Sequence, residues 1–301
     1  MILGFFTTAV TLFAYSIANS VILLIALRFL QGATEAPLWV NAQSIAASLS
    51  SDASRGKAMG SYGTSWGLGF GAGPLIGGLL YSSIGPAYTF IISGAFALAA
   101  FLIMLTIQVP KPKPIVRKPE LRKIWPVCFA GLISAGVVAI IYNILPVYTT
   151  SGLRLSNFQA GLLITLFSMT RAFFFPTLGG VSDRKGHRKI ILFGIIGSSI
   201  GCALVALTSS PLAIAAIMLL LAVACGSIYP SVMSAVSKAG SGGNIGYVFG
   251  VFNSIIGIGS GIFPGIGGAL ADAYGPTSPF LMTAVIALLS TVVLWKILPK
   301  K

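Results

Sequence analysis

About ten long apolar runs, separated by short polar or Gly/Pro-rich breaks, leave this chain few folds to choose from. A bilayer core about 30 Å thick needs roughly 20 apolar residues per spanning helix, and the runs have about this length. They lack the alternation of apolar and polar residues that is typical of membrane strands, so helices are expected rather than a barrel. The predicted spans are 2–18, 21–49, 56–81, 87–109, 124–148, 157–178, 190–207, 212–236, 244–274 and 280–298.

The composition agrees with an all-α integral membrane protein. Only 8% of the residues are charged, 56% are hydrophobic, and the mean hydropathy is +0.95. Cys128, Cys202 and Cys225 lie inside apolar runs without paired spacing or a nearby His ligand, so we interpret them as packing residues. No metal site and no cofactor is expected. An enzyme is not expected either, because no nucleophile, base and orienting group recur together.

The net charge of +14 can indicate either membrane topology or nucleic-acid binding, and the positions of the basic residues along the chain distinguish the two. If the breaks alternate between two sides of a membrane, almost all basic residues fall on one side and Arg154 falls on the other. By the positive-inside rule that side is cytoplasmic, and it includes the C-terminus at Lys300 and Lys301. Nucleic acid is not expected as a partner, since no basic patch is interleaved with aromatic residues. The basic residues of the predicted cytoplasmic side are Arg55, Lys57, Lys111, Lys113, Arg117, Lys118, Arg122, Lys123, Arg184, Lys185, Arg188, Lys189, Lys238, Lys296, Lys300 and Lys301.

An internal repeat relates residues 56–85 to residues 246–275 without a gap. Nine glycine and proline positions coincide in the two segments. Duplicated helical halves are a known architecture of secondary transporters. The first copy has Gly56, Gly60, Gly67, Gly69, Gly71, Pro74, Gly77, Gly78 and Gly85, and the second has Gly246, Gly250, Gly257, Gly259, Gly261, Pro264, Gly267, Gly268 and Gly275.

Three motifs resemble those of the major facilitator superfamily, whose plan is two six-helix bundles around a central cavity. The first resembles the family's GxxxDRxGxRK loop and comprises Gly179, Asp183, Arg184, Gly186, Arg188 and Lys189. A second, Arg28-Phe-Leu-Gln31-Gly32, resembles the RxxQG pattern of the fourth family helix. The third resembles the GxxxGPxxGG pattern of the fifth helix, typical of proton-driven exporters, and comprises Gly69, Gly73, Pro74, Gly77 and Gly78.

The resemblance implies a division into two unequal halves. Residues 1–109 form an incomplete N-terminal bundle of four helices, residues 110–123 a basic cytoplasmic linker, and residues 124–301 a C-terminal bundle of six. If residues 2–18 are the third family helix, the first two are absent. Either the native protein is longer, or this is a shortened relative whose cavity lacks a wall.

The charged loop has two readings. Asp183 can meet the exposed N–H groups and positive dipole of a helix start, and the resemblance implies the helix that begins at Gly56. That contact would latch the cytoplasmic side shut and break as the halves rock. The alternative is a solvated loop that only sets topology. For the glycine motif, close helix packing is the simpler reading, and a functional bend at Pro74 is what the resemblance to exporters implies.

Ionisable residues inside spanning runs are scarce, and therefore informative. Glu35, Arg28 and Arg171 each cost on the order of 2.5–3.5 kcal/mol at a helix centre. Arg28, Gln31 and Glu35 share one helix face. We interpret Glu35 as the candidate for proton coupling or for binding a cationic substrate. A static ion pair with Arg28 or Arg171 is the alternative.

Other polar groups at mid-membrane depth are weaker candidates for a cavity. They are Tyr142, Asn143, Tyr229 and Asn253, and interhelical hydrogen bonding can explain each of them.

The function that this pattern predicts is proton-coupled export of a small organic molecule across the cell membrane by alternating access. The expected partners are the small-molecule substrate, protons and the lipid bilayer. One alternative is uptake of an organic anion, with Arg28 and Arg171 as ligands. Another is a truncated membrane protein that carries nothing and acts only as a binding partner.

Overall fold

The computed structural model describes residues 1–48, 55–107, 121–239 and 245–298. The described residues form nine α-helices and one π-helical turn, and no strand. Eight of the helices found there are long and apolar enough to cross a membrane. The prediction of an all-α integral membrane protein is confirmed. The elements are α1 (Ile2–Ser16), α2 (Val21–Ser48), α3 (Arg55–Thr106), α4 (Leu121–Val147), η1 (Tyr148–Gly152), α5 (Asn157–Lys185), α6 (His187–Ala206), α7 (Pro211–Ala239), α8 (Ile245–Tyr274) and α9 (Ser278–Ile297).

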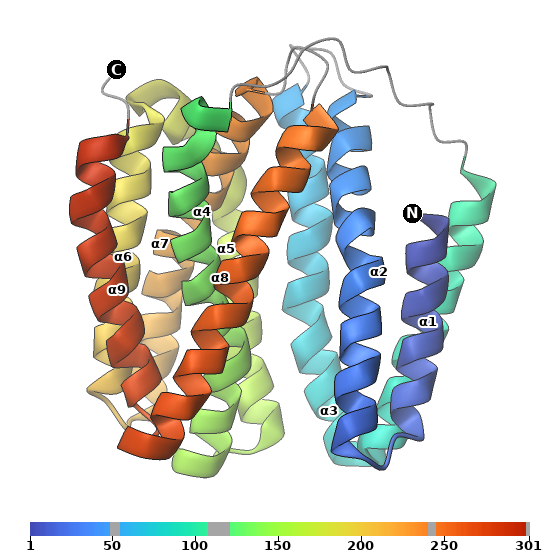
Figure 1. The fold of residues 1–301 in the computed structure, drawn as a ribbon. Coiled ribbons are helices and arrows are strands. Elements are labelled where there is room, and N and C mark those ends of the chain that lie inside the picture. The colour runs from blue at the N-terminus through green and yellow to red at the C-terminus, as the bar shows by residue number, and fades with distance from the viewer. Residues whose placement is uncertain (49–54, 108–120, 240–244, 299–301) are drawn as a thin grey trace.

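Helix α3 covers two of the predicted spans. Its 52 residues are interrupted only at Gly85, where φ is 82° and ψ is 173°. Figure 1 shows the chain descending along the first part of α3, reversing, and ascending beside α1. With α3 divided at Gly85, four helical segments precede α4 and six follow from α4 onwards, in agreement with the predicted total of about ten.

The reversal at Gly85 has a counterpart at the other end of the repeat. Gly275, which separates α8 from α9, has a φ of 95°, and each of the two glycines is followed by proline. A left-handed backbone ends a helix without a Cβ clash only at glycine, and proline cannot continue the preceding helix. The repeat therefore duplicates a chain reversal as well as a spacing.

The buried core belongs to the six C-terminal helices. Every residue of the main core cluster lies at position 124 or later, from Ile124 to Leu298. Helix α4 packs against α8, α5 against α7, and α6 against α7 and α9. The thiols of Cys128, Cys202 and Cys225 are free and buried there.

Two contacts join the N-terminal helices to this core. The first part of α3 packs along α5, and α2 packs against α8 (Figure 1). On α5 the Thr165 hydroxyl donates to the carbonyl of Gly71 at 2.8 Å, and Gly161 lies against the carbonyl of Pro74. Close backbone approach between small residues is how membrane helices associate when hydrophobicity provides no net drive.

Candidate functional site

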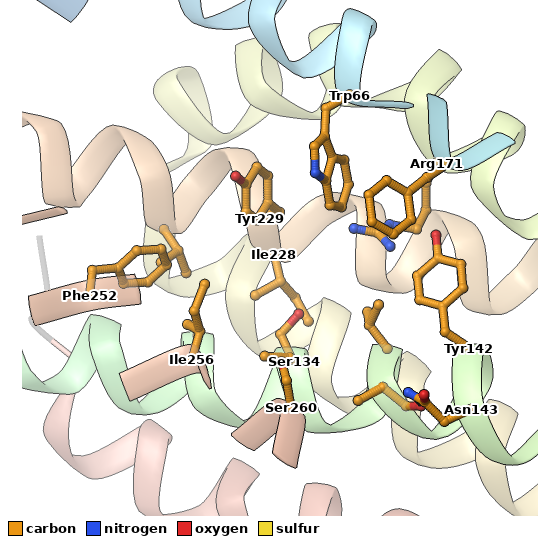
Figure 2. Close-up of a pocket in the computed structure, with 16 residues that line it drawn as sticks. Trp66, Ser134, Tyr142, Asn143, Arg171, Ile228, Tyr229, Phe252, Ile256 and Ser260 are labelled. Carbon is orange, nitrogen blue, oxygen red and sulfur yellow. Dashed lines mark hydrogen bonds between the residues drawn. The ribbon is translucent and has the colours of Figure 1, made fainter. Parts of the chain in front are cut away.

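A cavity of about 370 Å³ lies where the two halves meet. It is lined by residues of α3 from the N-terminal half and of α4, α5, α7 and α8 from the C-terminal half (Figure 2). Most of the wall is aromatic or aliphatic, with a few polar groups among the apolar ones. This composition is typical of sites for small organic molecules. The lining residues are Trp66, Phe70, Gly131, Ser134, Ala135, Val138, Ala139, Tyr142, Asn143, Arg171, Ile228, Tyr229, Val232, Phe252, Ile256 and Ser260.

Arg171 is the charged residue of the cavity wall. It lies on α5 and is only 4% exposed. Its guanidinium carbon is 5.6 Å from the ring centre of Trp66 and 5.3 Å from those of Phe167 and Phe175. Figure 2 shows the guanidinium between Trp66 and Tyr142. Aromatic faces attract a cation by roughly 0.5–2 kcal/mol each, so they stabilise the charge at this depth.

The rings do not satisfy the hydrogen bonds of this guanidinium. Nε and Nη1 of Arg171 are buried and have no hydrogen-bond partner. A buried donor without an acceptor costs about 1–3 kcal/mol, and more when it is charged. Arg171 is therefore a cation held in place by ring faces, with N–H groups that still lack an acceptor.

Three of the predicted cavity residues do line this cavity. The hydroxyl of Tyr142 is 2.7 Å from that of Ser168, the Asn143 amide donates to the carbonyl of Ala139 at 2.8 Å, and Tyr229 stacks on Trp66 at 6.0 Å. These local bonds hold the side chains at the cavity wall. A side chain here can therefore make a hydrogen bond within the protein and also line the cavity.

The motif on α2 forms a separate polar cluster against α1. Gln31 lies at its centre: its oxygen accepts from Tyr15 and Arg28, both at 3.0 Å, and its amide donates to Glu35 at 2.8 Å. Glu35 also accepts from Thr8 at 3.2 Å. Arg28 is exposed, Glu35 half-buried and Gln31 buried. Gln31 therefore connects the cation to the carboxylate, and none of these residues lines the cavity.

Asn253 lies near the cavity wall but has another partner. Its amide donates to Gln43 on α2 at 2.9 Å and to the carbonyl of Phe249 at 2.7 Å. Gln43 is only 4% exposed, so this bond joins the two halves inside the molecule. The sequence reasoning did not single out Gln43. The available signal was its polarity, because an amide inside an apolar helix needs a hydrogen-bond partner.

Part of the charged motif lies outside the described residues, including the side chains of Asp183 and Arg184 and the surroundings of Gly179. The helix α5 extends to Lys185, further than the predicted end at 178, and the break is confined to Gly186 with a φ of 87°. Arg188 donates to the carbonyl of Trp295 near the end of α9 and its guanidinium lies 5.0 Å from that ring centre. Lys189 is exposed.

The glycine motif on α3 has two faces. Gly78 lies against the backbone of Asn157, because a Cβ added at Gly78 would be 3.1 Å from the carbonyl oxygen of Asn157. Pro74 contacts Gly161. A Cβ at Gly69, Gly73 or Gly77 would meet nothing within 4 Å. Gly67 and Gly71, which belong to the repeat and not to the motif, also pack tightly on α5, against Ala172 and Met169.

A helical membrane protein whose two halves line a common cavity has the architecture of a secondary transporter. The model of the Major Facilitator Superfamily matches residues 1–126 and again residues 127–301, so the chain belongs to this superfamily. It is a multi-pass membrane protein of a family of transporters.

Relatives and solved structures agree with this assignment. The chain is 26% identical over 265 residues to the multidrug resistance protein MdtG of Serratia proteamaculans (strain 568), and 26% identical over 261 residues to MdtG of Escherichia coli (strain K12 / DH10B). Each alignment covers 82% of this chain and 64% of the relative. The chain thus spans less than two thirds of the length of these relatives.

The same fold occurs in a POT family transporter solved with 5-aminolevulinic acid, with a TM-score of 0.80 and 13% identity over 98% of this chain and 80% of that one. It also occurs in the human organic anion transporter MFSD10 (TETRAN), with a TM-score of 0.73 and 18% identity over 97% and 76% of the two chains. At these identities the likeness concerns the fold alone.

Proposed function

We propose that this protein exports a small organic molecule across the cell membrane in exchange for protons, by alternating access at the cavity between its halves. The observation that carries the proposal is that one cavity is lined from both halves. When the halves rock, a molecule held there changes the side of the membrane to which it is open.

The size and lining of the cavity support a small organic substrate. A volume of about 370 Å³ is within the range of small-molecule sites. Export is the direction that the similarity to proteins named for multidrug resistance favours.

Glu35 is the proposed proton carrier. It is half-buried among Thr8 and Gln31, and protonation would remove the acceptor charge that these donors meet. The same helix α2 carries Gln43, which holds the C-terminal half through Asn253, and Pro37 lies between Glu35 and Gln43. Glu35 and the contact between the halves at Gln43 therefore lie on one helix, and we propose that a change at Glu35 is passed along it.

The topology proposed from the basic residues completes this picture. The start of α6 and the end of α9 lie at one end of the bundle, because Arg188 contacts Trp295. We place this end, with the C-terminus, in the cytoplasm. The Asp183 motif is proposed as the cytoplasmic gate, in contact with the start of α3 near Gly56.

Flux in proteoliposomes tests the proposal. The probes are 2-naphthoate, 2-naphthamide and 2-naphthylmethylammonium, which differ in charge on one aromatic body. We expect an imposed pH gradient to drive at least one of them faster than in protein-free liposomes. The variant Glu35→Gln should lose this acceleration, whereas Asp272→Asn, at an exposed carboxylate near the end of α8, should keep it.

Full acceleration in Glu35→Gln would remove Glu35 from the mechanism. If none of the three probes is transported, the alternative of a membrane protein that only binds a partner and does not transport is favoured.

Uptake of an organic anion is the second candidate, and the buried cation Arg171 favours it. The directions of proton and substrate movement distinguish the two candidates. In export, protons enter as the substrate leaves, whereas in anion uptake the protons and the anion enter together.

A further inference from the structure

We propose that Arg171 is the binding site for the single negative charge of an aromatic or amphipathic carboxylate, so that the substrate of this cavity is an organic monoanion. The inference rests on the proposed function, since it names the substrate class of the same cavity.

The charge balance lacks a carboxylate for this cation. Among the residues whose side chains the structure describes, the carboxylates are Glu35 and Asp272. Glu35 is bound within the cluster of α1 and α2, and Asp272 is exposed near the end of α8. Neither lines the cavity, whereas Arg171 does. A buried charge is normally paired, so an anion that enters the cavity is the counter-charge that this part of the chain does not supply.

The guanidinium offers the right donors for a carboxylate. Ring faces of Trp66, Phe167 and Phe175 lie 5.3–5.6 Å from its carbon and compensate its charge, but they accept no N–H in the plane of the group. Nε and Nη1 have no partner. A guanidinium binds the two oxygens of a carboxylate through Nη2 together with either Nε or Nη1, so one of the two unpartnered groups takes part in each such pair. Both atoms are buried, so binding requires a rotation of the Arg171 side chain that turns the guanidinium toward the anion.

The rest of the wall sets the remaining chemistry of the ligand. Tyr142, Ser134 and Asn143 supply neutral polar groups, while Phe252, Ile256 and Val138 supply apolar surface. One cation balances one negative charge, and a dianion would leave a charge uncompensated against this apolar wall. The cavity therefore fits a carboxylate on an aromatic or branched hydrocarbon body.

Equilibrium dialysis tests the proposal on the full chain in phosphatidylcholine nanodiscs. The probes are tritiated 2-naphthoate and the uncharged 2-naphthamide, with empty nanodiscs subtracted. We expect 2-naphthoate to bind at least about tenfold more tightly than the amide, a difference of about 1.4 kcal/mol. In Arg171→Gln this ratio should fall to about one while the amide affinity is retained, and in Arg171→Lys part of the ratio should remain.

The variant Arg154→Gln is the matched control, because it removes one exposed positive charge outside the cavity. It should keep the full ratio. The proposal is overturned if the parent protein does not prefer 2-naphthoate, if Arg171→Gln weakens both probes equally, or if Arg154→Gln lowers the ratio as much as Arg171→Gln does. Retained binding of the amide shows that the variant is folded.

Binding and flux fail separately. A chain that binds 2-naphthoate through Arg171 but carries no probe would overturn the transport proposal and keep the anion site. Flux of 2-naphthamide without any preference for 2-naphthoate would do the reverse.

Discussion

The two halves of this molecule have similarly apolar helices and very different burial. In the most apolar window of the α4 span 67% of residues are buried, against 11% in that of α2 and 6% in that of the α3 span. Phe167 and Phe249 in the C-terminal half are fully buried, whereas Phe29 and Phe96 in the N-terminal half are 81% and 72% exposed. Apolar composition thus indicates that a helix enters the membrane, but it does not determine how much of that helix is buried against other helices.

The difference also separates the candidate roles. The buried half supplies most of the cavity wall, including Arg171 on α5. The N-terminal half carries the polar cluster of Tyr15, Gln31 and Glu35 on α1 and α2. Our proposals therefore place substrate binding and proton binding in different halves, which contact each other through α3 against α5 and α2 against α8.

The largest expected effect is a pair of Phe→Ala substitutions, one in each half. Phe167→Ala removes a ring that is 0% exposed, and we expect a loss of about 3–5 kcal/mol in the free energy of unfolding from the cavity it leaves. Phe96→Ala, at a ring that is 72% exposed, should change it by less than about 0.5 kcal/mol. Unfolding in mixed micelles with increasing SDS measures both, and equal losses would contradict the comparison.

The contact between the halves provides the second prediction. In Gly161→Ala the new Cβ would lie 2.8 Å from the backbone carbonyl of Pro74, so α5 and α3 must separate, at a cost of about 1–3 kcal/mol. Gly77→Ala is the control, because its Cβ would meet nothing within 4 Å. The same unfolding measurement applies. A control as destabilised as Gly161→Ala would show that α3 packs differently.

The hydrogen bond between Gln43 and Asn253 is expected to have a smaller effect. Polar bonds between membrane helices are worth about 0.6 kcal/mol on average. A double-mutant cycle with Gln43→Leu and Asn253→Leu should give a coupling energy of about 0.5–1.5 kcal/mol. Strict additivity of the two single variants would mean that this bond does not hold the halves together.

The smallest change in the free energy of unfolding is expected inside the N-terminal half. Tyr15→Phe removes the hydroxyl that donates to Gln31 at 3.0 Å, and the ring keeps its contact with Phe90 at 5.3 Å. We expect a loss of about 0.5 kcal/mol. The matched comparison is Tyr148→Phe in the C-terminal half. It removes the hydrogen bond that the Tyr148 hydroxyl donates to the carbonyl of Thr208 in the same half. A much larger loss for Tyr15→Phe than for Tyr148→Phe would place more of the stability in the α1–α2 cluster than in the C-terminal half.

Much of the fold could be predicted from residue patterns. The apolar runs predicted the helices, and the breaks between spans 56–81 and 87–109 and between spans 244–274 and 280–298 contain the chain reversals at Gly85 and Gly275. Helix ends were less accurate at the charged motif, where α5 continues to Lys185, because a helix end in water needs no apolar residue. The site was predictable in part: rarity of charge in the membrane indicated Arg171 and Glu35, but it did not indicate which of them faces a cavity.

The sequence by itself determined that this chain is a helical membrane protein of duplicated design, since helix period, apolar length and glycine position are local properties that solvation in lipid makes decisive. Only the tertiary structure decided that Arg171 lies among three aromatic rings in a shared cavity, that Gln31 separates Arg28 from Glu35, and that Gln43 meets Asn253. These contacts join residues from different helices, and their distances depend on how those helices pack, which no single segment specifies.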